Sequence, residues 1–398
     1  MAKATIDDID VAGQRVLLRV DFNVPMRDGH VVDDWRIRES LPTIEALVSR
    51  SARVIVVTHL DRPGGKVDDT LRVAPIADRL AELLGNPVAT ASDVVGDDAR
   101  RVVLGLQDGD VGMLENVRFE PGEEENDGRF VRKLASFGDV FVNDAFGSAH
   151  RAHASTEGVA HRLPAVAGLL MARELEALGG VLEHPREPVV AIIGGAKVST
   201  KLGVLTNLLD RVDVIWVGGA MASTFFRALD VGTGTSRVEA DQVDTARRIL
   251  HESHTRRAYI RLPMDVVVAP SAVEGVETRV VSFEKIPADA IVVDIGPETA
   301  ERIRRDSEHA GTVVWNGPLG IYEIPSFAKG TRAVAEALGR TSATTIAGGG
   351  DLVAALQDSG VADKISHIST GGGATVEFLE GKTLPGVAAL RDRETEQA

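Results

Sequence analysis

The sequence predicts an α/β protein with two doubly wound, parallel-sheet domains of the Rossmann-like type, separated by a cleft and joined by a hinge helix. A chain of 398 residues is too long for one compact core, which favours two domains. Short apolar, β-branched runs alternate with longer amphipathic segments from end to end. This alternation is typical of βα units, whose strands form parallel sheets covered by helices on both faces.

Both halves contain several strand candidates. In the first half, strands are expected at 15–20, 53–58, 111–115 and 139–143, with helices at 39–49 and 74–84. In the second half, strands are expected at 189–193, 212–217, 266–269, 291–294, 312–315, 344–347 and 365–369. A closed eight-stranded barrel is the main structural alternative, but more than eight strands spread over two halves fit two open sheets better.

The boundary between the halves is expected at 171–187. A helical pattern there is predicted to end at Gly179 and Gly180, and Pro185 and Pro188 prevent its continuation. The predicted organisation is an N-terminal domain at 1–170, a connecting helix and linker at 171–187, a C-terminal domain at 188–375 and a terminal segment at 376–398. A helix between two sheets is a stiff connector about which domains can swing.

Composition excludes several classes of function. The net charge of −15 opposes binding to nucleic acid or to an anionic membrane. No run approaches the length of about 18 apolar residues that a membrane span needs, and the first residues lack the apolar core of a secretory signal. The absence of cysteine excludes disulfides and thiolate chemistry. We therefore expect a cytoplasmic protein that attracts any anionic ligand through a local basic cluster.

Glycines follow almost every predicted strand of the second half. They occur in IIGGAK (192–197), WVGGAM (216–221), DIGP (294–297), WNGP (315–318), AGGGD (347–351) and STGGGA (369–374). Strand ends of an open parallel sheet share one edge, where glycine admits a ligand close to the backbone and helix N-termini favour phosphate. Any one of them could be an ordinary turn residue, but six at one edge favour nucleotide or polyphosphate binding.

The two commonest nucleotide-binding motifs are missing. Gly381–Lys382–Thr383 lacks the first glycine of a Walker A loop, because position 376 is valine. Gly232 and Gly234 do not continue into a dinucleotide fingerprint. Lys197 and Lys201, four residues apart at a predicted helix start, would lie on one side of that helix and hold an anion, or else be a solvated pair. Asp351 is either a helix cap or a Mg²⁺ ligand.

Basic residues gather at the strand ends of the first half. They are Arg19, Arg36, Arg62, Arg118 and Arg151, accompanied by His59, His150 and His153. Such a cluster would repel itself without an anion, and arginine matches carboxylate and phosphate geometry, although scattered surface arginines are the simpler alternative. Asp21 and Asn23 lie two apart in an extended segment and would accept hydrogen bonds from a substrate hydroxyl. The acidic run 123–127 is interpreted as a solvated turn.

Long motifs then give a family resemblance over essentially the whole chain. They are RVDFNVP (19–25), HLDRP (59–63), ENVRF (115–119), NDAFGSAHRAHAS (143–155), GGAKVSTK (194–201), WNGPLG (315–320), GGGD (348–351) and STGGGATVEFLEGK (369–382). In this order and spacing, the sequence closely resembles the bacterial type of the phosphoglycerate kinases. The resemblance implies transfer of a phosphoryl group between ATP and the carboxylate of 3-phosphoglycerate, in glycolysis.

The resemblance also implies the site residues. The N-terminal domain would bind 3-phosphoglycerate through Asp21, Phe22, Asn23, Arg36, His59, Leu60, Asp61, Arg62, Arg118 and Arg151. The C-terminal domain would bind Mg-ATP through Lys197, Lys201, Gly219, Asn316, Glu323, Gly349, Gly350, Asp351 and Leu352, with Asp351 on the metal. The catalytic set would be Arg36, Lys201, Gly371 and Gly372, and the C-terminal segment would return to the N-terminal domain.

The implied chemistry needs no general base, because a carboxylate nucleophile is already ionised at neutral pH. Catalysis would rest on alignment and on charge stabilisation by Arg36, Lys201, Mg²⁺ and helix N-termini, with closure of the hinge bringing the substrates together. The expected partners are these small molecules alone, on a monomer.

Two positions depart from the family pattern: Asp61 replaces a glycine and Leu352 replaces a threonine. A catalytically weakened binding protein is therefore one alternative. A nicotinamide dehydrogenase, the other, lacks its fingerprint.

Overall fold

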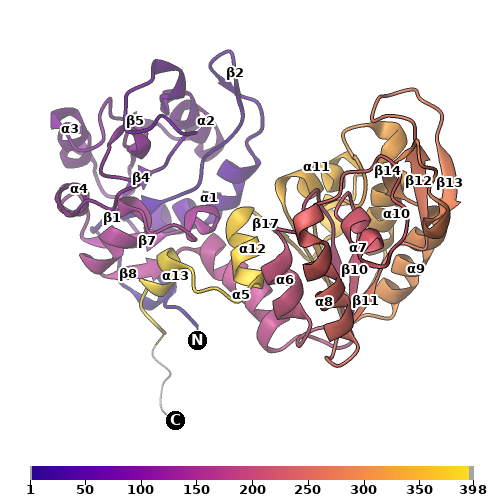
Figure 1. Ribbon diagram of the computed structural model, residues 1–398. Coiled ribbons are helices and arrows are strands. Elements are labelled where there is room, and N and C mark those ends of the chain that lie inside the picture. Colours follow the sequence, from indigo (N-terminus) through magenta and orange to yellow (C-terminus); the bar gives the residue numbers. More distant parts are fainter. Residues whose placement is uncertain (1, 394–398) are drawn as a thin grey trace, which may run out of the picture. The chain divides into compact units, whose positions relative to one another are not determined.

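The computed structural model describes residues 2–393 and divides into two compact units. Unit 1 comprises residues up to Glu176 together with the chain from Thr383 onward, and unit 2 is Ala177–Lys382. Each unit contains a six-stranded, all-parallel sheet flanked by helices (Figure 1). The predicted α/β class, with a parallel sheet in each of two units, is therefore confirmed.

The sheet of unit 1 has the order β5-β6-β4-β1-β7-β8. Its strands are β1 (Arg15–Arg19), β4 (Arg53–Val57), β5 (Val88–Thr90), β6 (Val111–Met113), β7 (Val140–Asn143) and β8 (Ala165–Ala167). The helices are α1 (Trp35–Ser49), α2 (Ala74–Leu84), α3 (Asp97–Gly105) and α4 (Gly128–Ala135), and β2 (Met26–Arg27) pairs with β3 (His30–Val31) in a short hairpin. The central strands are buried on both faces, which explains their continuous apolar runs.

Local sequence explains why α2 lies where the periodicity predicts it. Pro75 occupies the first turn, where its missing N–H has no partner to lose. Ile76, Ala77 and Leu80 form the buried stripe, and Gly85 ends the helix with φ +66, a conformation that glycine adopts without steric cost.

The parallel sheet of unit 2 has the order β11-β10-β9-β15-β16-β17. Its strands are β9 (Val189–Ile193), β10 (Val214–Val217), β11 (Tyr259–Arg261), β15 (Thr312–Asn316), β16 (Thr344–Gly348) and β17 (His367–Ser369). The helices are α6 (Leu202–Leu208), α7 (Ala222–Ala228), α8 (Val243–Ser253), α9 (Pro297–Glu308), α10 (Lys329–Leu338), α11 (Gly350–Asp358) and α12 (Gly373–Leu379).

Two predicted strands of the second half do not join this parallel sheet. The runs at 266–269 and 291–294 form β12 (Asp265–Ala269) and β14 (Ile291–Ile295), which pair antiparallel with each other and with β13 (Arg279–Ser282) in a separate three-stranded sheet. The expectation that the DIGP turn shares the glycine-rich edge is therefore wrong, and five of the six glycine turns follow strands of the parallel sheet. Apolar runs do not reveal strand direction, which depends on pairing partners far away in the chain.

The connecting helix is longer than predicted. α5 (Leu169–Glu183) passes through Gly179 and Gly180 without ending there, and Glu187–Pro188 is a cis peptide bond. Glycine lowers helix propensity by about 1 kcal/mol but does not forbid a helix that packing supports, and Leu178 and Val181 beside these glycines are buried.

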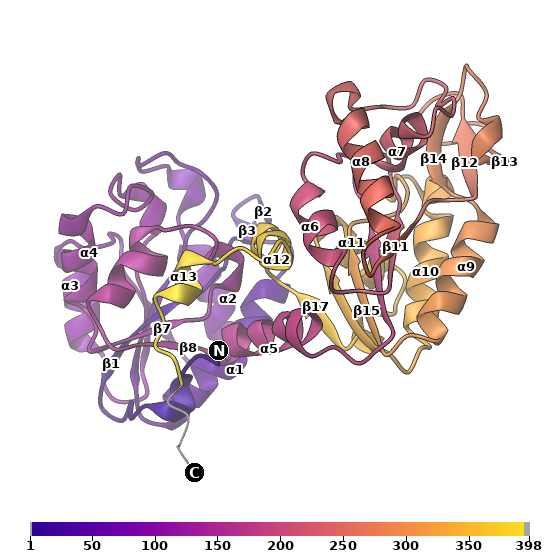
Figure 2. The ribbon, with the colours of Figure 1, turned by 60° about the horizontal axis from the view of Figure 1, so that its bottom comes forward.

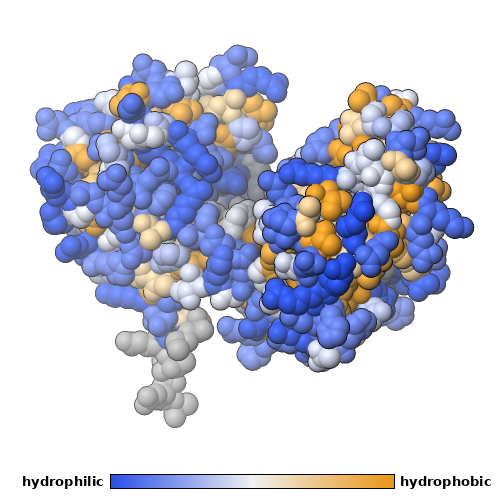
Figure 3. Space-filling view, viewed as in Figure 1, coloured by the Kyte–Doolittle hydropathy of each residue, from blue (hydrophilic) through white to orange (hydrophobic). Residues whose placement is uncertain are grey.

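The C-terminal segment belongs to unit 1 although the residues before it belong to unit 2. α13 (Pro385–Ala388) lies beside β7 and β8 (Figures 1 and 2), and Asn143 Nδ2 donates to the carbonyl of Gly386 at 3.1 Å. Lys3 Nζ lies 2.8 Å from Asp392 Oδ1. Among the described residues no helix has the length and apolarity to cross a membrane, and the face in Figure 3 is largely hydrophilic with scattered apolar areas.

Candidate active site

The strand order of unit 1 reverses between β1 and β7, and most of the predicted substrate residues follow the carboxyl ends of its strands. Asp21 and Asn23 follow β1, His59, Asp61 and Arg62 follow β4, Arg118 lies in the turn after β6, and Arg151 comes after β7. In an open α/β sheet this edge, at the reversal of strand order, is where ligands bind.

Asp21 is joined to helix α1 by an ion pair. Arg36 Nη1, in the first turn of α1, lies 2.9 Å from Asp21 Oδ1, and Ser148 Oγ donates to Asp21 Oδ2 at 3.2 Å. Burial acts to raise the pKa of Asp21, but a charge on His59, the guanidinium groups of Arg36 and Arg19, and the N–H of Asn23 all lower it, so that the pKa lies below its ordinary value. With His59 neutral, the two arginines and the Asn23 N–H still favour the ionised form. Asp21 is therefore a carboxylate at neutral pH and fixes the orientation of Arg36.

The loop after β4 is held by its neighbours. The backbone N–H of Asp61 donates to Asn23 Oδ1 at 2.9 Å, and Arg118 Nη1 donates to the carbonyl of Asp61 at 2.5 Å. Asp61 has φ +50, in the left-handed region that glycine adopts without strain and that aspartate tolerates. This positive φ explains why the family motif normally has glycine at this position.

The cations of this edge differ in how far they are already engaged. Arg62 is exposed and, within the described part of the chain, makes neither a hydrogen bond nor an ion pair. Arg151 Nε donates to His150 Nε2 at 3.2 Å. Arg118 is 5% exposed, and its Nε lies 3.3 Å from Glu124 Oε1. Arg62 therefore offers a whole guanidinium to a ligand.

Phe22 and Leu60 enter the apolar core of unit 1, so their side chains are not available to a polar ligand. The backbone of Leu60 is held by Asn116, whose Oδ1 accepts from the Leu60 N–H at 3.1 Å and whose Nδ2 donates to the Leu60 carbonyl at 2.8 Å. Asn116 is fully buried and was missed by sequence reasoning, although it lies within the ENVRF motif.

The interpretation of residues 123–127 as a solvated turn is wrong for Glu123. Its carboxylate is completely buried and accepts from the N–H of Ser155 at 2.9 Å and from Ser155 Oγ at 2.6 Å. A run of acids looks solvated from composition, and only the fold reveals that its first member points inward.

The strand order of unit 2 reverses between β9 and β15; Lys201 lies in the turn after β9, and Asn316 is the last residue of β15. Lys201 Nζ donates to Asn316 Oδ1, and Asn316 Nδ2 donates to the carbonyl of Gly348 at 3.0 Å. Burial lowers the pKa of Lys201, while the charges of Glu380 and Asp351 oppose that shift. The ammonium group is thus held at the edge where five glycine turns meet.

Lys197 and Lys201 do not share a helix face as predicted. α6 begins only at Leu202, so both lysines lie in the turn before it. Lys197 is exposed, whereas Lys201 is half-buried. The sequence distance of four residues implied helical proximity that the turn does not provide.

The glycines of this edge are required by the backbone at particular positions. Gly219 has φ +69, and a Cβ there would lie 2.6 Å from the backbone N of Gly195. Gly349 has φ +107 and Gly372 has φ +51. The N–H of Gly371 donates to Ser369 Oγ at 3.1 Å. Gly350 and Gly372 have open space where a side chain would be, which allows close approach of a ligand.

Asp351 lies in the first turn of α11 but makes no capping hydrogen bond there. Burial raises the pKa of Tyr322, and the charges of Asp351, the exposed Glu323 and Asp358 add to that increase. Among residues 2–393 no group of three His, Asp or Glu side chains could hold a metal. A single carboxylate at this glycine-lined edge fits Mg²⁺ only if a ligand supplies phosphate oxygens, because protein sites hold Mg²⁺ through one or two carboxylates, substrate phosphates and water.

Leu352 has no exposed surface and belongs to the apolar core of unit 2. Its side chain therefore contributes to packing, so buried apolar surface stands here in place of the hydroxyl of the usual threonine.

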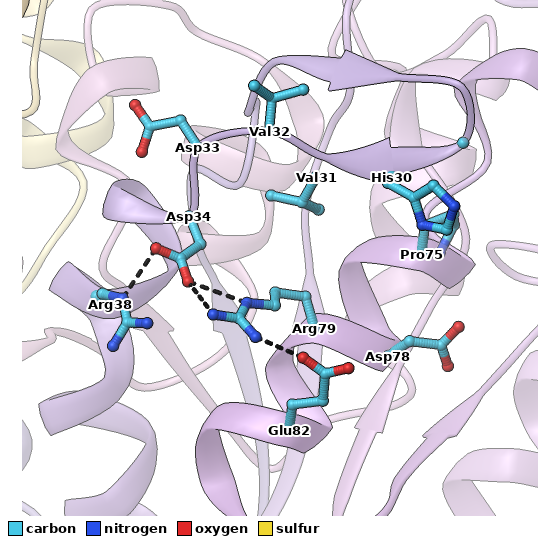
Figure 4. Close-up of a pocket in the computed structure, with 11 residues that line it drawn as sticks. His30, Val31, Val32, Asp33, Asp34, Arg38, Pro75, Asp78, Arg79 and Glu82 are labelled. Atoms are coloured by element: carbon cyan, nitrogen blue, oxygen red, sulfur yellow. Dashed lines mark hydrogen bonds and ion pairs between the residues drawn. The ribbon is translucent and has the colours of Figure 1, made fainter.

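A cavity of about 610 Å³ lies elsewhere in unit 1 (Figure 4). Arg79 Nη2 is 2.6 Å from Asp34 Oδ2 and Arg38 Nε is 2.8 Å from Asp34 Oδ1, so these cations are already paired. Asp33, Asp78 and Glu82 also line it. Volume alone does not identify a phosphate site, because this lining would repel an anion.

The comparisons with known proteins agree with this geometry. A model of the family described as "Phosphoglycerate kinase" matches residues 6–382. The chain belongs to the phosphoglycerate kinase family. It is 56% identical over 393 residues to the phosphoglycerate kinase of Pelotomaculum thermopropionicum, covering 99% of this chain and 100% of that relative. The enzyme of Thermomicrobium roseum is 51% identical over 388 residues, with 98% and 99% covered.

Solved structures give the same result. Phosphoglycerate kinase from Coxiella burnetii has a TM-score of 0.88 at 39% identity, covering 97% of this chain and 98% of that one. The enzyme from Pyrococcus horikoshii OT3 has a TM-score of 0.87 at 35% identity, with 98% of both chains covered. The expected resemblance to the phosphoglycerate kinases is confirmed, and with it the classification of the protein as a phosphotransferase.

Proposed function

We propose that this protein catalyses reversible phosphoryl transfer between ATP and the carboxylate of 3-phosphoglycerate, giving ADP and 1,3-bisphosphoglycerate. The observation that carries the proposal is that each of the two parallel sheets has its own set of polar residues where its strand order reverses, and that the two sets differ in chemistry. One is a set of arginines with a carboxylate and an amide, and the other is a glycine-lined edge with Lys201 and Asp351. The first suits a small phosphorylated acid and the second a nucleotide phosphate chain.

In unit 1, Arg62, Arg118 and Arg151 would bind the phosphate of 3-phosphoglycerate. Arg62 is free for this role, because it makes no internal ion pair within residues 2–393. Asp21 and Asn23 would accept hydrogen bonds from its hydroxyl. Phe22 and Leu60 would support the substrate site from the core, where their side chains are buried.

Arg36 would stabilise the phosphoryl group during transfer. Its ion pair with Asp21 holds the guanidinium in one orientation and uses Nη1, which leaves Nε and Nη2 as further donors. A donor fixed before the reaction stabilises developing charge without the cost of reorienting at the moment of transfer. The acceptor carboxylate needs no base, because it is ionised at neutral pH.

In unit 2, Lys201 would bind the nucleotide phosphates, and its ammonium group is positioned by the hydrogen bond to Asn316 Oδ1. The backbone at Gly349, Gly350 and Gly372 would allow close approach of the phosphates, and Glu323 would hydrogen-bond the ribose. Asp351 would hold Mg²⁺, which when bound with ATP neutralises phosphate charge. We further propose that the protein acts in the cytoplasm as a monomer.

A coupled assay tests the proposal: purified protein is supplied with Mg-ATP and 3-phosphoglycerate, and ADP formation is followed. Turnover that requires both substrates is the expected result. A folded sample that binds 3-phosphoglycerate by calorimetry but shows no turnover would instead indicate a binding protein. Replacing 3-phosphoglycerate with glycerate, which lacks the phosphate, should abolish turnover at millimolar concentrations if the arginines act as proposed.

A further inference from the structure

A chain of four buried polar side chains lies at the substrate edge of unit 1. Arg19 is 1% exposed, Glu123 0%, Ser155 1% and His59 4%. They come from four separated parts of the sequence and are linked by hydrogen bonds. Burying two charges is unfavourable unless they are paired and hydrogen-bonded, so the arrangement calls for a specific explanation.

Arg19, at the end of β1, is fixed at three of its nitrogen atoms. Nε donates to Ser155 Oγ at 2.8 Å, Nη1 donates to the carbonyl of Val20, and Nη2 lies 3.1 Å from His59 Nδ1. Ser155 Oγ in turn donates to Glu123 Oε1, so the guanidinium is connected to a buried carboxylate.

These contacts determine the protonation of His59. A guanidinium has only donors, so His59 Nδ1 must be the acceptor and carries no proton. The neutral ring then carries its proton on Nε2, to which no residue of the described chain hydrogen-bonds. His59 follows β4, next to Leu60 and Asp61 of the proposed substrate site.

The surrounding charges keep the imidazole neutral. Burial lowers the pKa of His59 well below its ordinary value, and only the nearby Asp21 carboxylate opposes this. Arg19, Arg118 and Arg36 all add to the lowering, because a second positive charge among them is unfavourable. A second histidine of this region, His153, lies near the buried Glu123, with Nδ1 3.8 Å from Glu123 Oε1, and its pKa is lowered to about 4 by burial and then by Arg118.

We propose that Arg19 is a positioning residue that fixes His59 as the neutral Nε2–H tautomer, so that His59 donates one hydrogen bond to an anionic oxygen of the bound phosphoglycerate. Ser155 and Glu123 hold Arg19 in place and compensate its charge. The identity of the ligand rests on the proposed function, whereas the tautomer does not.

The tautomer is measured directly in the wild-type protein. Two-bond ¹H–¹⁵N correlation spectra of the ¹⁵N-labelled chain distinguish the three states of a histidine ring, and the His59 signals are assigned by their loss in His59→Gln. We expect an unprotonated Nδ1 and a protonated Nε2 from pH 6 to 8. A ring protonated on Nδ1, whether neutral or cationic, overturns the proposal whatever the enzymatic activity.

A double variant then tests the role of Arg19. Arg19→Met with Glu123→Gln removes the donor and the compensating charge together, which avoids leaving a lone buried carboxylate. We expect His59 to lose the pure Nε2–H pattern and KM for 3-phosphoglycerate to rise about 10-fold, with kcat changed much less, because the hydrogen bond serves the ground state and the transition state alike. The single variant Glu123→Gln, which keeps Arg19, should retain the Nε2–H tautomer of His59.

Arg15→Met is the matched control. Arg15 lies at the other end of β1, where Nη2 is 2.6 Å from Asp139 Oδ1, and it does not contact His59. The tautomer and KM should be unchanged in it. A folded double variant with wild-type tautomer and KM would overturn the proposal. If the wild-type protein shows the Nε2–H tautomer but no kinase turnover, the proposed function is refuted and the role of Arg19 in fixing His59 is still supported.

Discussion

The backbone N–H of Asp61 donates to the side-chain Oδ1 of Asn23 at 2.9 Å, which ties the loop after β4 to the loop after β1. Asp61 makes this bond with φ +50. The carboxylate of Asp61 lies in the same loop as Arg62, one of the arginines proposed to bind phosphate. The backbone of Asp61 therefore helps to order the substrate loop, whereas its negative charge opposes the binding of an anionic substrate.

Asp61→Gly should therefore tighten substrate binding with little change in stability. Loss of the negative charge lowers KM for 3-phosphoglycerate by about 2- to 5-fold at low ionic strength, an effect that salt screens. Relief of the left-handed strain, about 1 kcal/mol, is offset by the greater freedom of glycine in the unfolded chain. Steady-state kinetics measures the change in KM, and urea unfolding measures the change in stability. Asp61→Asn removes only the charge and should lower KM equally; a decrease confined to the glycine variant would show that the backbone is responsible.

Arg36→Met should lower kcat by about 100- to 1,000-fold, the usual effect of removing one preorganised donor to a transition state. KM for 3-phosphoglycerate should change far less. Arg38→Met is the control, because Arg38 lies on the same helix and pairs with Asp34 at 2.8 Å, away from Asp21. Steady-state kinetics with both substrates decide the matter, and a rise in KM alone would contradict the assignment.

Asp351→Asn should weaken the Mg²⁺ dependence of the reaction. Loss of the carboxylate is expected to raise the free Mg²⁺ needed for half-maximal rate about 10-fold or more, since hard cations prefer charged oxygen ligands. Initial rates against free Mg²⁺ at fixed ATP measure this. Asp358→Asn, at the opposite end of α11, is the matched control. Equal Mg²⁺ curves for wild type and Asp351→Asn would remove Asp351 from the metal site.

Leu352→Thr, which restores the usual family residue, should destabilise this protein by about 2 kcal/mol. The side chain is completely buried among apolar neighbours, so the change loses burial and introduces a hydroxyl that must be desolvated. Urea unfolding gives the difference, and Leu352→Met, which conserves volume, should cost less than about 1.5 kcal/mol. A threonine variant as stable as wild type would mean that the hydroxyl finds a partner in this core.

Asp294 predicts a specific pH dependence of stability. Burial raises the pKa of its carboxyl to about 7. The hydrogen bonds from the N–H groups of Gly330 and Ile295 favour the ionised form and only partly oppose this increase. Because the folded pKa exceeds the unfolded value, the native state holds a proton that the unfolded state releases. This group's contribution to the free energy of unfolding therefore falls as pH rises from about 4 to about 7, by a few kcal/mol.

Asp294→Asn removes this titration. The free energy of unfolding of the variant relative to wild type should rise between pH 4 and pH 8, as measured by urea unfolding at each pH. A difference that is independent of pH would show that Asp294 is already ionised in the folded protein at pH 4.

The sequence by itself determined the α/β class and the family, because both depend on information that lies close together in the chain. The helix at 74–84 and the strand at 189–193 match their predicted bounds, since proline, glycine and apolar spacing specify them locally. The long motifs placed the arginines and glycines after strands, and parallel strands bring such ends to one edge of a sheet.

Only the tertiary structure decided which residues are buried and which strands pair. The run at 266–269 is antiparallel because its partners come from β13 and β14, and Glu123 is buried because Ser155, 32 residues later, supplies its hydrogen bonds. Leu352 similarly packs with residues from several other elements. Hydrogen-bond partners and burial are properties of contacts between distant segments, so neither the charge of a residue nor its spacing along the chain reveals them.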